Sequence, residues 1–221
     1  SGPIAINGTK VVRAFAYKQG WKASNVDTQS YLFIDDIVSQ TASTATALGF
    51  PTGPIPPRNQ VLRYGMTLGN VTAAGGTLQD LKNALAAVPT VCMSTDVANL
   101  MNSSTGIYAN ADKHGLFWER PVSLEYLNAA RPFEFQIDCG ARIRGGYSRS
   151  ANNPKHGFHL FFRGSLYDGD LKYRLFGVNG ASQFDQIDMR CEQNYSCSFD
   201  GSTQNSLMRE EWTRLTQGDL G

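Results

Sequence analysis

The amino-acid sequence predicts an α+β fold in which antiparallel strands dominate and helices are few. The main observation is the segment 133–144, where apolar and polar residues alternate over a full strand length. Shorter alternating segments follow at 158–163 and 184–191, whereas helical spacing is confined to short stretches such as 78–85. We therefore expect strands that have one buried and one solvated face.

Composition and charge exclude several other classes of protein. Hydrophobic residues make up 41% of the 221 residues and aromatic residues 11%, which excludes disordered, collagen-like and coiled-coil chains. The net charge of +1 argues against general binding to nucleic acids or membrane surfaces. No apolar run is long enough for a membrane span. The charge is uneven, because residues 142–174 hold seven Lys or Arg against two Asp.

Residues 1–34 are predicted to be β-structure. A strand over 3–6 is expected to turn at Asn7-Gly8 into a second strand over 11–17, because Asn-Gly between β-forming residues favours a hairpin. A third strand is predicted over 31–34. Three strands do not make a stable domain, so we expect the rest of this sheet upstream.

Residues 35–76 are predicted to be a connector, because the dense prolines and glycines of 49–57 disfavour a helix or a central strand. Thr77 is a plausible cap for a helix that ends at Pro89. A short buried strand over 91–93 and a short helix over 95–101 are expected next. The closing helix, 206–217, carries Met208, Trp212 and Leu215 on one stripe.

The long strand and its neighbours predict a cluster of cations. Arg142 and Arg144 fall on one solvated face, and Lys155 and Arg190 fall on the corresponding side of the next strands. Together with the Gly- and Ser-rich loop 145–150, they would suit a phosphate-bearing ligand. The alternative is a solvated face whose cations pair with acids, and the acids available are Glu134, Asp138 and Asp188.

Other candidate residues allow two interpretations each. Glu210 on the closing helix could hold Lys155 in place, as in many nucleotide-phosphate sites, or could simply face water. The run Asp168-Gly169-Asp170 resembles a metal loop but is more typical of a turn. The spacing of the histidines matches no catalytic triad or zinc motif.

The four cysteines are too few for a disulfide scaffold. Cys139 and Cys191 fall on buried faces, where they could be free thiols or one cross-strand disulfide. Cys197 could instead close a small loop with Cys191. For Cys92 a buried free thiol is favoured.

Two resemblances to known families cover much of the chain. The first rests on the motifs Ser1-Gly2-Pro3-Ile4, Lys10-Val11-Val12-Arg13-Ala14-Phe15-Ala16 and Gly20-Trp21-Lys22-Ala23-Ser24. With these motifs, residues 1–34 resemble the last strands of the β-sandwich found at the C-terminus of chitobiase/β-N-acetylhexosaminidase-type proteins. The second rests on motifs that include Trp118-Glu119-Arg120-Pro121, Gln136-Ile137-Asp138, Gly140-Ala141-Arg142-Ile143-Arg144-Gly145-Gly146-Tyr147-Ser148-Arg149-Ser150, Asn153-Pro154-Lys155-His156 and Arg209-Glu210. With these motifs, the chain from Pro89 onward resembles the spore-coat protein H (CotH) kinase-like family.

The second resemblance implies a divergent kinase-like fold, with 77–221 as the N-terminal portion of the domain. It implies binding of ATP with Mg²⁺ or another divalent metal and, in some members, phosphorylation of Ser in a protein substrate. Lys155 would contact phosphate, Glu210 would hold it, and the loop 145–150 would cover the nucleotide. The nucleotide-binding residues implied are therefore Lys155, Glu210, Arg144, Gly146, Ser148 and Arg149.

The catalytic and metal-binding aspartates of this family would lie beyond Gly221, so we expect this segment alone to be inactive. Both ends of the chain look like cuts through a longer polypeptide. We therefore expect the remainder of that polypeptide to be a partner of this segment. The two resemblances together imply a secreted or cell-surface bacterial multidomain protein. The alternative is a non-catalytic adhesion or carbohydrate-associated surface module.

Overall fold

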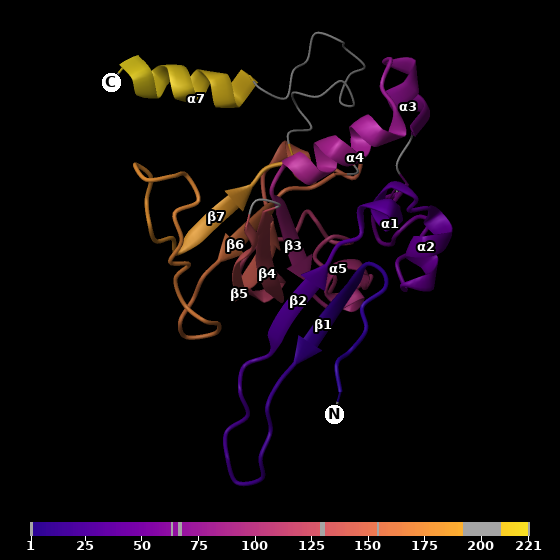
Figure 1. Ribbon diagram of the computed structural model, residues 1–221. Coiled ribbons are helices and arrows are strands. Elements are labelled where there is room, and N and C mark those ends of the chain that lie inside the picture. The colour runs from indigo at the N-terminus through magenta and orange to yellow at the C-terminus, as the bar shows by residue number, and fades with distance from the viewer. Residues whose placement is uncertain are drawn as a thin grey trace.

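The computed structural model describes residues 2–62, 64–65, 68–128, 131–153, 155–191 and 209–220. It confirms an α+β fold, with a five-stranded and a two-stranded antiparallel sheet and a few short helices (Figure 1). Both sheets join strands that follow one another along the chain, which is the simplest way to build antiparallel structure.

The five-stranded sheet has the order β3-β4-β5-β6-β7. Its strands are β3 (Thr90–Ser94), β4 (Arg120–Asn128), β5 (Arg131–Ile143), β6 (Phe158–Phe161) and β7 (Gln186–Met189). The period-two alternation predicts β5 correctly, and the register places Leu124 opposite Ile137 and Ala141 opposite Leu160. These apolar residues share one side of the sheet, which we call the core face.

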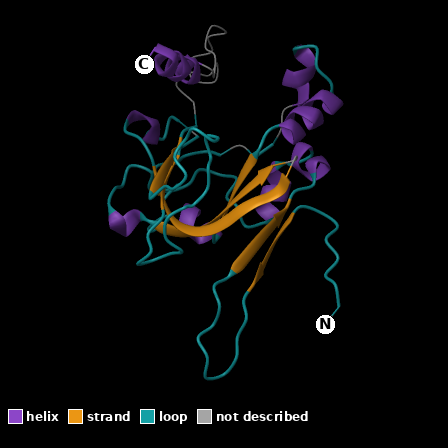
Figure 2. Cartoon of the chain, turned by 60° about the vertical axis from the view of Figure 1, so that its left-hand side comes forward, coloured by secondary structure: helices purple, strands orange, loops and turns teal. Residues whose placement is uncertain are grey.

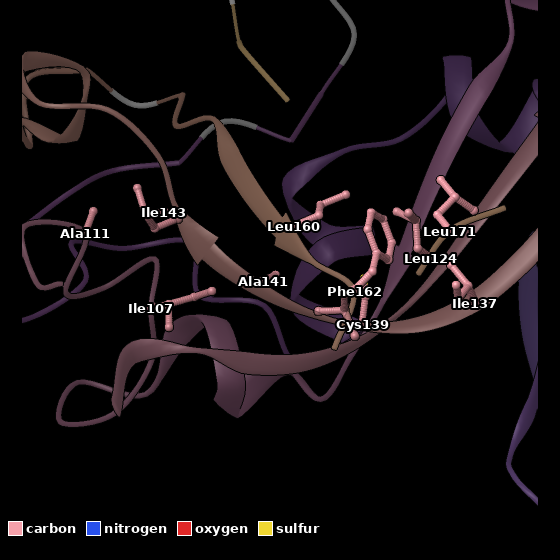
Figure 3. Close-up of a cluster of buried hydrophobic side chains, with 11 residues drawn as sticks. Ile107, Ala111, Leu124, Ile137, Cys139, Ala141, Ile143, Leu160, Phe162 and Leu171 are labelled. Atoms are coloured by element: carbon pink, nitrogen blue, oxygen red, sulfur yellow. The ribbon is translucent and has the colours of Figure 1, made fainter. Parts of the chain in front are cut away.

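The hydrophobic core lies between the core face and the loops that cross it (Figure 3). Ile107 and Ala111 come from the segment between helix α5 (Val97–Met101) and β4, and Leu171 comes from the segment between β6 and β7. Phe162 and Leu160 are almost completely buried. Each such side chain contributes about 1.5–3 kcal/mol through burial, so this layer fixes the sheet on which the polar residues stand.

The two-stranded sheet is a hairpin of β1 (Lys10–Ala14) and β2 (Asp27–Tyr31). The predicted turn at Asn7-Gly8 is wrong, because residues 3–6 form no strand and the connection is the long loop 15–26, which projects away from the main sheet (Figures 1 and 2). Asp36 explains the difference, since its Oδ2 accepts the Thr9 backbone N–H at 2.6 Å and ties the start of β1 to the next helix.

The predicted connector contains short helices. They are α1 (Ile34–Val38), α2 (Ala42–Ala47) and α3 (Leu68–Ala73). Thr41 and Thr44 form a capping box that starts α2, a local signal that the density of Pro and Gly farther along obscured. Residues 49–57 themselves contain no helix, as expected.

The remaining helices agree with their sequence signals. α4 (Leu78–Ala87) begins at Thr77, whose side chain forms a capping box with Asp80. α5 (Val97–Met101) and the 3₁₀ turn η1 (Leu116–Trp118) lead into β4. In α7 (Arg209–Leu220), Trp212 and Leu215 are exposed, while Met208 lies outside the described residues. Within the described part of the chain, no helix has the length and apolar character of a membrane span.

Candidate functional site

Of the predicted cations, only Arg142 lies within a described strand, on the side of the sheet opposite the core, which we call the polar face. Arg144, Lys155 and Arg190 lie just outside β5, β6 and β7, so their predicted strand positions are wrong. Arg142, His159 and Asp188 occupy matching positions there on β5, β6 and β7. The expectation of a wholly solvated face is only partly correct. The β1–β2 hairpin covers one end, where the Ser30 backbone N–H donates to the Glu125 carboxylate at 2.8 Å and Glu125 is fully buried.

Arg142 is neutralised by a buried acid. Its guanidinium donates to Glu119 Oε2 from Nε at 2.9 Å and from a terminal nitrogen at 2.7 Å. Glu119 lies above Gly140, where a Cβ atom would come within 2.3 Å of Glu119 Oε1. Gly140 thus makes room for the carboxylate that holds Arg142.

A second arginine completes this cluster. Arg163 lies 3.4 Å from Glu119 Oε2, and the guanidinium groups of Arg142 and Arg163 lie 4.2 and 4.5 Å from the centre of the Phe161 ring. Two cations, one carboxylate and one aromatic ring therefore form a compact structural unit. Arg142 belongs to this unit rather than to an open binding surface.

Arg144 is paired as the alternative interpretation expected. Its Nε donates to Asp188 Oδ2 at 2.8 Å, and His159 Nδ1 lies 3.5 Å from the other oxygen of Asp188. Asp188 is thus the expected acid that takes Arg144, whereas Arg142 is taken by Glu119, which was not among the expected acids. A guanidinium has five N–H donors, and the pair with Asp188 uses the one on Nε.

Arg144 opens onto a cavity of about 170 Å³, which we call the turn cavity. Its floor is the tight turn 145–148 that leads into the 3₁₀ turn η2 (Tyr147–Arg149). The structure thus brings Arg144, Gly146 and Ser148 together. The full lining is Arg144, Gly145, Gly146, Tyr147, Ser148, Gly157, Arg190 and Cys191.

The turn requires glycine. Gly145 has a φ of +97°, and a Cβ atom there would lie 2.0 Å from Ser148 Oγ. Gly157, which also lines the cavity, lies so near β7 that a Cβ atom would approach the Met189 carbonyl oxygen to 2.6 Å. The close approach of these backbones shapes the cavity.

Arg149 points away from the turn cavity. Its guanidinium donates to the carbonyl oxygens of Ala111 at 3.1 Å and Lys113 at 2.8 Å, and also to that of Gly145. Arg149 therefore fastens the turn to the segment before β4. This is a positioning contact, and it is different from the nucleotide contact that the family resemblance implies.

Residues of the connector contact the glycine turn and hold it in place. His156 is buried, with Nδ1 2.8 Å from the Ser148 carbonyl oxygen and Nε2 2.9 Å from Gln60 Oε1. Arg58 also donates to the carbonyl oxygen of Arg149. Burial is the largest influence on the imidazole and lowers the pKa of His156. The connector is thus docked on the turn rather than loose.

Lys155 is exposed and is not among the residues that line the turn cavity, although its carbonyl oxygen accepts a hydrogen bond from Cys191 at 3.3 Å. The side chain of Glu210 lies outside the described residues, so the structure does not place the Lys155–Glu210 pair. No group of three or more His, Cys, Asp or Glu that could hold a metal occurs in the described ranges.

The structure settles the bonding state of some of the cysteines. Cys92 and Cys139 are free thiols, which removes the disulfide between Cys139 and Cys191. Cys139 is fully buried in the core, and burial raises its pKa to about 12. Cys197 lies outside the described residues.

Asp168 is a residue whose role the sequence did not indicate. Its Oδ1 accepts from Asn25 Nδ2 at 2.7 Å and its Oδ2 accepts from the backbone N–H of Asp138 at 2.8 Å. Gly169 has a φ of +94°, and Asp168 and Asp170 lie in bends of the chain. Glu119 was also missed, although it lies in a motif of the family resemblance.

Comparison of the chain with known proteins finds no matching family model, curated protein or solved structure.

Proposed function

We propose that the turn cavity binds the phosphate groups of ATP, and that the chain is the nucleotide-binding part of a CotH-like atypical kinase domain. The observation that carries this proposal is that Arg144 and Arg190 line the same cavity as a glycine turn. Guanidinium groups bind phosphate oxygens through paired hydrogen bonds, and the backbone amides of such turns favour anions.

The size of the cavity supports a phosphate group as its occupant. Sites that enclose whole small molecules have volumes of about 300–1,000 Å³, whereas the turn cavity has about 170 Å³. The base and ribose of ATP would therefore lie outside it. A phosphate would also compete with Asp188 for Arg144, so binding should be moderate unless Mg²⁺ or further residues contribute.

Transfer of the phosphate to a protein serine would need residues that the family resemblance does not assign to this chain. The family resemblance places the catalytic and metal-binding aspartates beyond Gly221, and those residues would hold Mg²⁺ and activate the acceptor hydroxyl. The chain's own residues would orient the phosphates. The proposed protein is secreted or displayed on a bacterial cell surface, where a chitobiase-type sandwich would act as a spacer.

A non-catalytic surface module is the second candidate. The observation that favours it is the neutralisation of Arg142 by Glu119 and of Arg144 by Asp188, since paired cations also stabilise a sheet that binds no nucleotide.

Calorimetric titration with ATP, with and without Mg²⁺, separates the two functions. It should be done on this chain and on a longer polypeptide that extends past Gly221. We expect saturable binding that Arg190→Ala weakens by about tenfold or more, the effect of losing one charge-assisted hydrogen bond. The family resemblance, rather than the lining of the cavity, predicts that Lys155→Ala weakens binding too. The matched control Lys172→Ala, an exposed lysine elsewhere, should not weaken it. If the longer protein folds but binds no ATP, the kinase proposal is contradicted and the non-catalytic surface module is the remaining candidate.

A further inference from the structure

A larger cavity lies between the β1–β2 hairpin and the polar face. It has a volume of about 370 Å³, and we call it the hairpin cavity. Asp138 in β5 lines it, whereas Arg144, six residues farther along the chain and just past the end of β5, lines the turn cavity. At about 3.3 Å per strand residue, the two positions are about 20 Å apart. The hairpin cavity is therefore a separate site.

The wall of the hairpin cavity is held rigidly. The carboxylate of Asp168 accepts hydrogen bonds from Asn25 of the hairpin and from the backbone of Asp138 in β5. The contact with Asn25 joins residues that are 143 positions apart in the chain. Asp138 Oδ1 in turn accepts from Gln136 Nε2 at 3.2 Å. Two acceptor groups are thus fixed in position before any ligand arrives.

Two charged side chains of the lining form no hydrogen bond or ion pair within the described part of the chain. Asp96 is the N-cap residue of α5, but its side chain makes no capping hydrogen bond. Within the described chain, neither the Asp96 carboxylate nor the Arg13 guanidinium forms a hydrogen bond or an ion pair. Both residues line the cavity. The Asp96 carboxylate has full capacity for a ligand, whereas the charge of Arg13 already acts on Asp138 and partly offsets the rise in its pKa.

The rest of the lining offers mixed donors and acceptors. Ser94, Thr95 and Asn99 supply hydroxyl and amide groups, and Tyr167 supplies an aromatic surface. Three carboxylates, those of Asp96, Asp138 and Asp168, face one guanidinium, so the lining carries more negative than positive charge. Such a site disfavours phosphates and favours ligands that are neutral or positively charged.

We infer that the hairpin cavity binds a saccharide of one or two rings and prefers a sugar that carries a protonated amine. Fixed carboxylates and amides form hydrogen bonds to neighbouring hydroxyls, the tyrosine ring packs against the apolar side of a sugar ring, and the amine offsets the excess of carboxylates. The volume lies within the range of about 300–1,000 Å³ that encloses small molecules.

The electrostatics of Asp138 agree with this preference. Burial is the largest influence and raises the pKa of its carboxyl group, and the nearby charge of Asp168 raises it further. Two acids that disfavour each other's charge gain when a cation binds between them.

The test is a set of calorimetric titrations of the full chain with three probes. They are the β-1,4-linked disaccharide of glucosamine, the neutral disaccharide cellobiose and glucose 6-phosphate. We expect the amino disaccharide to bind more tightly than cellobiose and the phosphate not to bind. Failure of both disaccharides to bind, or equal affinity for the two, would overturn the inference.

Variants locate the site. Asp96→Asn should weaken binding of the amino disaccharide by about tenfold while changing cellobiose binding little. Asn is as good an N-cap residue as Asp, so α5 should be retained. Asp35→Asn removes the same charge from an exposed pair with Lys82 on α1 and should change neither. If Asp96→Asn and Asp35→Asn change the affinity for the amino disaccharide equally, the hairpin cavity is not its binding site. ATP binding at the turn cavity is a separate measurement, and its outcome does not affect this one.

Discussion

The buried carboxylate of Glu119 should be worth several times as much stability as any exposed ion pair of the same sheet. Its side chain is 3% exposed, and its partners Arg142 and Arg163 are 21% and 36% exposed. Removing one partner of a buried pair costs about 3–5 kcal/mol. Because both arginines keep some contact with water, we expect about 3 kcal/mol for Glu119→Gln. For a chain of 221 residues this lowers Tm by about 6–12 °C.

The measurement is urea and thermal unfolding of Glu119→Gln beside Asp188→Asn. The Asp188 side chain is 43% exposed, so neutralising the partner of Arg144 should cost about 1 kcal/mol or less. In the double variant Glu119→Gln/Arg142→Gln the loss should be smaller than the sum of the single losses, because Arg142 is then no longer a cation that has lost its carboxylate. A loss below 1 kcal/mol for Glu119→Gln, or additive effects, would refute the reasoning.

Further predictions concern the turn, the hairpin and pH. Gly145→Ala should lower the free energy of unfolding by about 1–2 kcal/mol or more in urea, because Gly145 has a left-handed φ. Gly146 has a φ of −109° and open space around its Cβ position, so Gly146→Ala should lower that free energy less. Ser30→Ala deprives buried Glu125 of a hydroxyl donor, so hydrogen exchange of β2 should become faster; unchanged exchange would contradict docking through this contact. Burial lowers the pKa of His156 from 6.5, so the unfolded chain binds the proton more readily and stability should fall as the pH drops through 6.5. Unfolding at several pH values should show this loss in the wild type but not in His156→Gln.

Local patterns predicted the local features of this chain well. The alternation over 133–144 gave β5 and its two faces, because a half-buried strand leaves a period of two in the sequence. Thr77 indicated the start of α4 because capping depends on residues within one turn. The position of Arg144 beside the glycine turn also followed from neighbours in the sequence.

Features that depend on distant residues were not predictable in this way. Asn7-Gly8 has the chemistry of a hairpin turn, but the contact of Thr9 with Asp36 directs the chain elsewhere. The choice of Glu119 as the partner of Arg142 depends on the space above Gly140. The contact of Asn25 with Asp168 links segments whose separation leaves no periodic signal.

The central claim, that the turn cavity receives phosphate, is tested most directly by titrating the isotopically labelled chain with ATP and following its backbone amide resonances by NMR. We predict saturable shifts of the Gly145, Gly146 and Ser148 amides, which Arg190→Ala abolishes, with little change at Asn25 in the hairpin cavity. Saturable shifts confined to other residues, or none at all in the folded protein, would contradict the claim.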